Sequence, residues 1–468
     1  MKWLSLILLC FLASCTVGPK YAQPTVPTAP AYTESAGWKT AQPSDAFQKG
    51  KWWEIFNEPE LNTLEEQVAP ANQSLKIAEA NYREARASIQ FQRSFQFPTV
   101  SAAPSITTNR ISANYPVGGA GVQYGLFTLP INASFDADLW GRIRKAVEAA
   151  KEQSQASAAD FENVKLELQT ELASYYFTIR GLDSQKRLLD DTVVNYQKAY
   201  DLTNNRYNGG VASKAEVAQA KTQLNQTQAQ VIDLGEQRAR MEHGIAVLTG
   251  KAPEGFHVAV AQLQNVIPEI PLGIPSELLQ RRPDIAASER QVAAANAQIG
   301  IANTAFYPDL VIAATGGLQA GNFVNWFTWP SRLWGLGPQL TQTIFDAGRR
   351  RSQVTISEAA YDATVASYRQ TSLTAFQEVE DNLSTLRILE TETAKQHEAV
   401  EAAENSQQLA MNRYKGGLVT YFEVITAQTI ALTNERVEVD LLQRRMESAV
   451  QLVRALGGGW DTSKLPQS

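Results

Sequence analysis

Two glutamates in a duplicated motif are the residues whose type and spacing first suggest chemistry. Glu216 comes shortly after residues 205–210 (Asn-Arg-Tyr-Asn-Gly-Gly), and Glu423 comes shortly after residues 412–417 (Asn-Arg-Tyr-Lys-Gly-Gly). If the duplicated motifs surround a narrow pore in an assembled protein, their carboxylates favour the passage of cations. The alternative is that both are solvated residues at helix starts, where the positive end of the helix dipole stabilises an acidic side chain. The sequence leaves both interpretations open.

Signatures of catalysis and of metal binding are missing from the sequence. It has no Gly-x-Ser-x-Gly elbow, no His-Glu-x-x-His and no Walker loop. Its histidines, at positions 243, 257 and 397, are scattered. The 468 residues include 42 basic and 48 acidic ones, a net charge of −6, whereas a nucleic-acid-binding surface is basic. We therefore expect no enzyme, no metal site, no cofactor and no nucleic-acid partner.

The N-terminus has the features of a secretory signal peptide over residues 1–14. Lys2 precedes an apolar run, and small residues come just before Cys15. Leu-Ala-Ser-Cys at 12–15 resembles the bacterial lipobox, which implies acylation at Cys15. Several acyl chains anchor a protein stably in a membrane. An Asp directly after the lipidated cysteine retains lipoproteins at the inner membrane. This chain has Thr16 at that position, which favours the outer membrane. An ordinary cleaved signal is the alternative.

The chain contains an internal twofold repeat. The shift of 207 residues between the two Asn-Arg-Tyr motifs also carries Gly141-Arg142 onto Gly348-Arg349. Ordered matches at one shift indicate a duplicated architecture. The predicted division is a lipidated extended tether over 15–58, a first repeat over 59–248, an equatorial linker over 249–275, a second repeat over 276–456 and a C-terminal tail over 457–468.

Each repeat is predicted to contain a β-hairpin. From Phe127 to Leu139, apolar and other residues alternate over a span long enough to cross a bilayer with tilt. A counterpart lies at 334–344, and shorter partner strands are predicted to start near Thr99 and Asp309. Aromatic residues typical of an interfacial girdle accompany the second hairpin: Trp326, Phe327, Trp329 and Trp334. The alternative is a soluble β-sandwich in which one face of each sheet is exposed to solvent.

Four strands cannot close a wall against lipid, where each unpaired backbone group costs several kcal/mol. If the hairpins enter a membrane, several chains must share one barrel. Two chains give eight strands, a barrel filled by side chains, whereas three give twelve strands and room for a passage. The sequence therefore predicts an oligomer, and a trimer if transport is the task.

Very long helices follow the hairpins. Residues 141–207 and 348–414 are free of proline and rich in helix-favouring residues. A continuous helix of that length reaches about 100 Å, as a rod or tube requires. Shorter helices are expected to return over 213–249 and 420–456, and other helical stretches over 59–95 and 276–305 precede the hairpins.

Several motifs together resemble those of TolC-like outer-membrane efflux factors, in the lipoprotein branch typified by OprM and NodT. The resemblance covers essentially the whole mature chain. The motifs are residues 12–15 and 18–21 with Pro24, Trp52-Trp53 with Phe56 and Pro59, residues 138–142, residues 281–284, residues 345–349 and the two Asn-Arg-Tyr-x-Gly-Gly tips.

The family resemblance implies a mixed α and β membrane protein. The expected assembly is a homotrimer with a shared twelve-stranded barrel, four strands per chain, continuous with an α-helical coiled-coil tunnel through the periplasm. The implied partners are outer-membrane lipid, a periplasmic adaptor protein and an inner-membrane pump of the RND type. The implied function is that of an outer-membrane channel which passively conducts small molecules from the pump, with a periplasmic aperture that opens on adaptor docking. A structural coiled-coil lipoprotein without transport is the alternative.

The resemblance also places residues at the aperture. Arg413 and Tyr414 match positions that hold the family's closed state, and Phe422 matches an apolar constriction. Many members carry an Asp one turn later, where this chain has Thr426. The full predicted gate is Arg206, Tyr207, Glu216, Arg413, Tyr414, Phe422, Glu423 and Thr426. The predicted adaptor-docking turns, which plain helix capping also explains, are Gly210, Val211, Ala212, Ser213, Gly417, Leu418, Val419 and Thr420.

Other polar motifs are predicted to be structural. Residues 281–284 (Arg-Arg-Pro-Asp) are expected to begin a helix, with proline in its first turn and an acidic residue beside it. Asp136, Asp138 and Asp346 are expected to face water where strands join helices.

Overall fold

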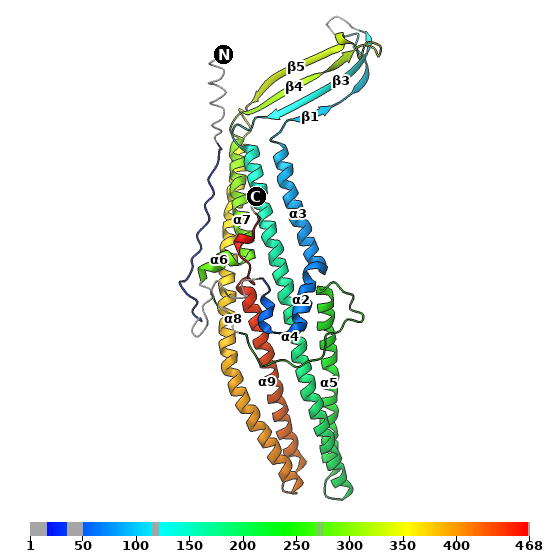
Figure 1. Cartoon of the computed structure of the whole chain (residues 1–468), viewed down its shortest axis with the longest axis vertical. Helices are drawn as coiled ribbons and strands as arrows, with labels where there is room; N and C mark the ends of the chain where they lie inside the picture. The colour runs from blue at the N-terminus through cyan, green and yellow to red at the C-terminus, as the bar shows by residue number, and fades with distance from the viewer. Residues whose placement is uncertain are drawn as a thin grey trace.

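The computed structural model describes residues 16–34, 50–114, 121–268, 270, 272 and 275–466. These residues form a long molecule with a β-sheet at one end and paired helices along the rest (Figure 1). The signal peptide predicted for residues 1–14 and the predicted lipidation site at Cys15 lie outside the described residues.

The described strands form one antiparallel sheet that joins the two repeats. Both β1 (Thr99–Ala102) and β2 (Ser105–Arg110) pair with β3 (Gln123–Asp136). The sheet continues from β3 to β4 (Asp309–Ala320) and then to β5 (Arg332–Thr341). Because β1 and β2 follow one another along the same edge of β3, the sheet is four strands wide, as predicted.

The strand starts at Thr99 and Asp309 agree with the prediction, whereas the end of β3 does not. The predicted alternation ran to Leu139, but the strand ends at Asp136. Asp138 has a φ of 46° and accepts hydrogen bonds from the first N–H groups of the next helix. The chain therefore turns before the apolar alternation is complete.

Strand register gathers apolar side chains on one face of the sheet. Phe127 pairs with Ala320, and Leu129 pairs with Leu318. Directly opposed residues share a face, so this apolar face runs across the strands. It continues onto β5, where Trp334 and Leu336 are 81% and 71% exposed. The opposite face is polar, and there Thr315 donates a hydrogen bond to Asn132 (Oγ1 to Oδ1, 2.9 Å).

The two long helices have the predicted length. Both α4 (Arg142–Asn208) and α8 (Arg349–Lys415) contain 67 residues. Each is followed by a return helix of 35 residues, α5 (Lys214–Leu248) or α9 (Tyr421–Ala455). The α4–α5 and α8–α9 hairpins form the end of the molecule far from the sheet (Figure 1).

The stretches predicted to be helical before the hairpins are each divided into two helices. The first is divided into α2 (Pro59–Ala71) and α3 (Gln73–Ser94), because Asn72 caps the second helix through its side chain. The second is divided into α6 (Leu278–Arg281) and α7 (Pro283–Thr304). A residue that precedes proline disfavours the helical conformation, which explains the break at Arg282.

Arg282 has the structural role predicted for its motif. It is 5% exposed and forms ion pairs with Asp284 (2.6 Å) and Glu378 (2.6 Å). It also donates a hydrogen bond to the carbonyl oxygen of Ala455 (3.2 Å). One buried guanidinium thus joins α7, α8 and the end of α9.

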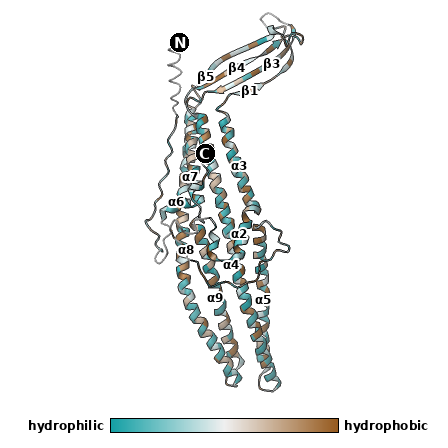
Figure 2. Ribbon diagram, in the orientation of Figure 1, coloured by the Kyte–Doolittle hydropathy of each residue, from teal (hydrophilic) through white to brown (hydrophobic). Residues whose placement is uncertain are grey.

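The main core lies around the middle of the helices. Trp52, Trp53 and Phe56 are buried there against α4 and α9. Arg238 on α5 reaches Asp183 on α4 (2.6 Å) and donates to the carbonyl oxygen of Val258 (2.8 Å), which holds part of the segment between repeats against both helices. No helix among the described residues has the length and apolarity needed to span a membrane, and hydrophilic residues recur along the long helices (Figure 2).

Residues 16–34, called here the N-terminal strap, have no helix or strand but are attached to the helices. The strap runs beside α7 and α8 (Figure 1). At one end, the N–H group of Val17 donates to the carbonyl oxygen of Trp140 (3.2 Å). At the other end, Glu34 pairs with Arg387 (2.6 Å). The strap is therefore extended but docked, whereas residues 52–56, which also belong to the predicted tether, form the 3-10 helix η2 (Trp52–Phe56).

Candidate functional site

The candidate site is the tip of the two helical hairpins, where the duplicated motif lies. Gly210 and Gly417 both have a φ of 73°, a backbone conformation that favours glycine. The next residues make equivalent hydrogen bonds, from the N–H of Val211 to the carbonyl of Arg206 (2.8 Å) and from that of Leu418 to that of Arg413 (3.0 Å). The repeat therefore builds the same helix-ending turn twice.

Two buried tyrosines join the hairpins. Tyr414 and Tyr421 are 2% and 1% exposed, and their ring centroids lie 5.3 Å apart. They pack with Ala199 of α4 and Ala220 of α5, and this set, with Val424, is called here the tyrosine cluster. The hydroxyl of Tyr414 donates to Thr203 on α4 (Oη to Oγ1, 3.3 Å). The cluster therefore contains side chains of both repeats.

Arg206 crosses from the first hairpin to the second. Its guanidinium carbon lies 4.7 Å from the centroid of the Tyr414 ring. One of its nitrogens donates to the carbonyl oxygens of Tyr414 (3.1 Å) and Lys415 (3.3 Å), at the C-terminus of α8. A cation at this position satisfies terminal carbonyls and interacts favourably with the negative end of the helix dipole.

Glu216 also connects the hairpins. It forms a capping box with Ser213 at the start of α5: its carboxylate accepts from the Ser213 N–H (2.7 Å). Its other oxygen accepts from the N–H of Tyr421 at the start of α9 (3.1 Å). The hydrogen bond from the Ser213 backbone is the largest cause that lowers the pKa of Glu216, with the Tyr421 N–H acting in the same direction. At Glu216 the geometry matches the helix-start interpretation.

The second-repeat counterparts are arranged differently. Arg413 pairs with Glu423 within the same hairpin at 3.6 Å, and their side chains are 58% and 51% exposed. Phe422 is 63% exposed, and Thr426 donates to its carbonyl oxygen (2.9 Å). Tyr207 is 41% exposed. Of the predicted gate residues, Arg206, Glu216 and Tyr414 make the cross-hairpin contacts, whereas the other five are exposed.

The predicted docking residues form the two turns at the tip. Val211 and Leu418, equivalent by the repeat, are 68% and 75% exposed. Val419 instead packs partly against the tyrosine cluster, and the side chain of Ser213 accepts from the N–H of Glu216 (3.2 Å). The docking set thus combines exposed apolar side chains with capping residues.

Sequence reasoning missed Tyr421 and Thr203. A signal for Tyr421 was present, because it continues the three–four spacing of apolar residues along α9 through Val424. Thr203 carries no such signal, since its partner Tyr414 is distant in the sequence.

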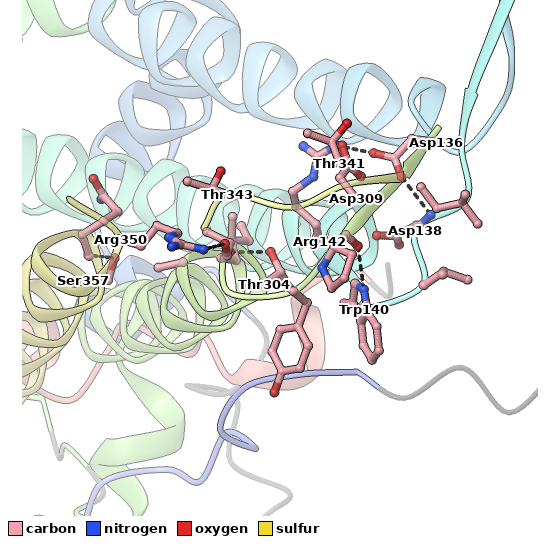
Figure 3. Close-up of a pocket in the computed structure, with 18 of the residues that line it drawn as sticks. Asp136, Asp138, Trp140, Arg142, Thr304, Asp309, Thr341, Thr343, Arg350 and Ser357 are labelled. Atoms are coloured by element: carbon pink, nitrogen blue, oxygen red, sulfur yellow. Dashed lines mark hydrogen bonds and ion pairs between the residues drawn. The ribbon is translucent and has the colours of Figure 1, made fainter. Parts of the chain in front are cut away.

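A cavity of about 660 Å³ lies where the strands join the helices (Figure 3). In it, Trp140 donates from Nε1 to the carbonyl oxygen of Pro308 (2.8 Å), which links the two repeats. Asp136, which lines the cavity, pairs with Arg142, whose guanidinium lies beside it (Figure 3).

The expectation that the junction aspartates face water was wrong. Asp138 pairs with Arg144 (3.1 Å), and Asp346 pairs with Arg350 (2.7 Å). Both carboxylates also accept backbone N–H groups at helix starts, so each side chain is only 12% exposed. They are helix caps covered by arginine.

Comparison with known proteins identifies the family. The model of the family described as "Outer membrane efflux protein" matches residues 64–251 and 274–458. The chain is 31% identical over 464 residues to the "Probable efflux pump outer membrane protein TtgC" of Pseudomonas putida, covering 98% of this chain and 95% of the relative. It is 27% identical over 452 residues to the "Cation efflux system protein CusC" of Escherichia coli, covering 96% of each.

A solved structure has the same fold. The outer-membrane channel OprN aligns with a TM-score of 0.90 at 29% identity, covering 95% of this chain and 100% of that one. The matches extend over both repeats and the sheet. This chain belongs to the outer membrane efflux protein family and is the outer-membrane component of an efflux system.

Proposed function

We propose that three copies of this chain form one channel with a shared twelve-stranded barrel. The observation that carries this proposal is the pair of open sheet edges. Among the described residues, β1 and β2 pair only with β3, and β5 pairs only with β4. Lipid offers no hydrogen bonds to these backbone groups, so the edge of one chain must pair with that of a neighbour.

The helices below the sheet support the same assembly. On α3, Ile77 and Phe91 are 62% and 61% exposed. On α8, Ile356 and Ile388 are 61% and 51% exposed. The helices α3 and α8 lie at opposite ends of the packing order α3–α4–α7–α8, as the sheet edges do. Exposed apolar side chains at both ends are suited to contact between neighbouring chains.

The trimer is tested by the mass of the detergent-solubilised protein. Analytical ultracentrifugation with correction for bound detergent is expected to give three chains per particle. A folded, strictly monomeric particle contradicts the proposal, because its sheet edges would remain open.

We also propose that the tip is the periplasmic aperture, with its closed state held by contacts between hairpins. Arg206, Glu216 and Tyr414 supply these contacts. An adaptor that docks on the exposed turns at Val211 and Leu418 competes with the closed arrangement and opens the aperture. Solute then passes without chemistry, driven by an inner-membrane pump, which we take to be of the RND type.

Conductance in planar bilayers tests the channel. The wild-type trimer is expected to show rare, small openings, and a variant without the cross-hairpin contacts to show frequent, larger ones. Absence of conductance from both proteins favours the alternative, a coiled-coil lipoprotein that braces the envelope without transport.

We further propose that the mature chain is anchored in the outer membrane through acylated Cys15. The strap supports this placement, because Val17 is hydrogen-bonded beside Trp140 at the junction of sheet and helices. Metabolic labelling with palmitate is expected to mark the wild type and not Cys15→Ser. Equal labelling of both contradicts the anchor.

A further inference from the structure

An arginine lies on the apolar face of the sheet. Arg332 begins β5 and pairs in register with Leu318 of β4, which also pairs with Leu129 of β3. Directly opposed residues share a face, so Arg332 belongs to the apolar face described above, and it is exposed there. In the proposed barrel this face meets lipid, where an arginine is costly unless it lies near the surface of the membrane.

The position of Arg332 along β5 corresponds to the membrane surface far from the helices. Leu340, near the helix end of the strand, lies eight residues away. At about 3.4 Å per residue this is about 27 Å along the strand, or about 20 Å along the membrane normal at a tilt of about 40°. The apolar band of a transmembrane barrel is about 25 Å tall. Arg332 therefore lies near the level of the outer-leaflet headgroups, at the end of the sheet remote from the helices (Figure 1).

Away from the helix end of the sheet, the strands carry arginine and no carboxylate. Residues 99–135 contain Arg110 as their one charged residue, and residues 310–345 contain only Arg332. Strand register places Arg110 on the apolar face as well. In the proposed trimer, the edge strands of the neighbouring chain therefore bring another cation to β5 and no anion. The far end of the sheet presents uncompensated positive charge, which is complementary to an anionic headgroup.

Aromatic side chains accompany this arginine. The guanidinium carbon of Arg332 lies 4.1 Å from the centroid of the Trp329 ring. Trp334, the next residue of β5 on the same face, is 81% exposed. These three residues are called here the rim patch. Indole rings favour the headgroup level of a membrane, and a guanidinium can donate two parallel hydrogen bonds to a phosphate.

The turn that carries the rim patch is folded and packed against the sheet. The hydroxyl groups of Thr328 and Ser331 both donate to the carbonyl oxygen of Asn325 (2.7 and 2.6 Å). The ring of Trp326, which is 8% exposed, lies against that of Phe127 on β3, with 5.6 Å between the centroids. A surface that is already ordered loses less conformational entropy when a ligand binds. The rim patch is therefore preorganised.

We propose that the rim patch binds the phosphate-bearing headgroup of a lipid in the outer leaflet. The guanidinium of Arg332 donates to two phosphate oxygens while it remains over the Trp329 ring, and Trp334 lies beside the upper part of the acyl chains. The placement of the patch in the outer leaflet rests on the proposed barrel, whereas the chemistry of binding belongs to a single chain.

Lipid titrations of the purified, full-length protein in detergent, followed by native mass spectrometry, test the binding. The probe is diphosphorylated lipid A, and the control lipid is the same molecule without its phosphates. The buffer contains EDTA, so that no divalent cation bridges the phosphates. The phosphorylated lipid is expected to bind about tenfold more tightly than the control lipid.

Variants assign the binding to the patch. Arg332→Gln is expected to bind diphosphorylated lipid A about tenfold more weakly than the wild type. Arg187→Gln removes the same charge from an exposed residue of α4 and is the matched control, expected to bind as the wild type does. If Arg332→Gln does not assemble, Trp329→Leu keeps the charge, removes the ring beside it and is expected to weaken binding severalfold.

Equal affinity of the wild type and Arg332→Gln for the phosphorylated lipid overturns the proposal, as does equal affinity of the wild type for the two lipids. Displacement of the lipid by an excess of inorganic phosphate also overturns it, because the patch would then bind free anions. A monomeric protein that binds lipid A through Arg332 loses the proposed trimer and keeps the patch. A trimer that does not distinguish the two lipids loses only the patch.

Discussion

Arg206 of the first hairpin lies over the ring of Tyr414 in the second, with 4.7 Å between the guanidinium carbon and the ring centroid. The repeat-equivalent Arg413 makes no such crossing and pairs within its own hairpin. The two copies of the duplicated motif therefore have different structural roles. One arginine ties the hairpins together, and the other stays at the surface.

Arg206→Ala is expected to open the tip. Two charge-assisted hydrogen bonds and a cation–π contact are lost, worth about 2 kcal/mol together, or a factor of about 30 in the closed-to-open ratio. Arg413→Ala is the matched control and is expected to change little, because an exposed ion pair contributes about 0–1 kcal/mol. The single-channel open probability measures the effect of each variant. A larger increase in Arg413→Ala than in Arg206→Ala contradicts the role of Arg206 in closing the tip.

Acidification is expected to weaken closure through Glu216. Its pKa is lowered in the folded protein chiefly by the Ser213 N–H of its own hairpin, but the Tyr421 N–H of the other hairpin acts in the same direction. The part due to Tyr421 favours closure above the ordinary value of 4.5 and is lost as the pH falls through the folded pKa. Open probability should therefore rise below about pH 4.5, the ordinary range of a carboxyl group. Glu216→Gln should be more open at neutral pH and lack this acid-dependent increase. The same acid response in wild type and variant assigns it to another group.

Glu423→Ala tests the carboxylate ring. If six glutamates line the aperture of a trimer, removal of the three exposed ones should reduce the cation preference of single channels, read from the reversal potential in a salt gradient. An unchanged reversal potential means that Glu423 is a helix-start residue only. Glu216 is poorly suited to replace Glu423 in such a ring, because both its carboxylate oxygens accept hydrogen bonds from backbone N–H groups.

Glu65 on α2 is expected to destabilise the protein. It is 0% exposed, neither of its oxygens has a hydrogen-bond partner among the described residues, and burial raises its pKa well above the ordinary value. Folding therefore takes up a proton, and the free energy of unfolding should fall as the pH rises above 4.5. Glu65→Leu should add about 1–3 kcal/mol at neutral pH and reduce this slope.

Thermal unfolding followed by circular dichroism measures the effect of Glu65. The control is Glu66→Leu, because Glu66 is 57% exposed and pairs with Lys51 at the surface. A lower melting temperature in Glu65→Leu than in the wild type shows that the carboxyl has a stabilising partner.

Gly18→Ala is expected to detach the N-terminal strap. Gly18 has a φ of 117°, and a Cβ atom there lies 2.5 Å from the Cα atom of Gly300. No side-chain rotation relieves this contact, because the Cβ atom is fixed to its own backbone and the neighbouring atom is backbone. Limited proteolysis should cut the strap of the variant faster than that of the wild type, whereas exposed Ala22→Ser should leave the rate unchanged. Equal protection in all three proteins means that the strap is held elsewhere.

Local patterns in the sequence determined much of this molecule. The proline-free runs predicted both 67-residue helices to within one residue, because helix propensity and Gly-Gly turns act locally. The alternation around Phe127 predicted a strand with one apolar face. The repeat predicted two equivalent tips, and the count of four strands led to the oligomer.

Only the tertiary structure determined which member of each repeat-equivalent pair contacts the other hairpin. Arg206 and Arg413 have the same sequence surroundings, yet only Arg206 meets a buried tyrosine and the end of a helix. Glu216 and Glu423 differ in the same way. The physical reason is that packing places two related but not identical hairpins side by side in one direction, so each presents a different face to the other. A local sequence pattern does not predict which arginine makes the contact, because the contact depends on residues about 200 positions away.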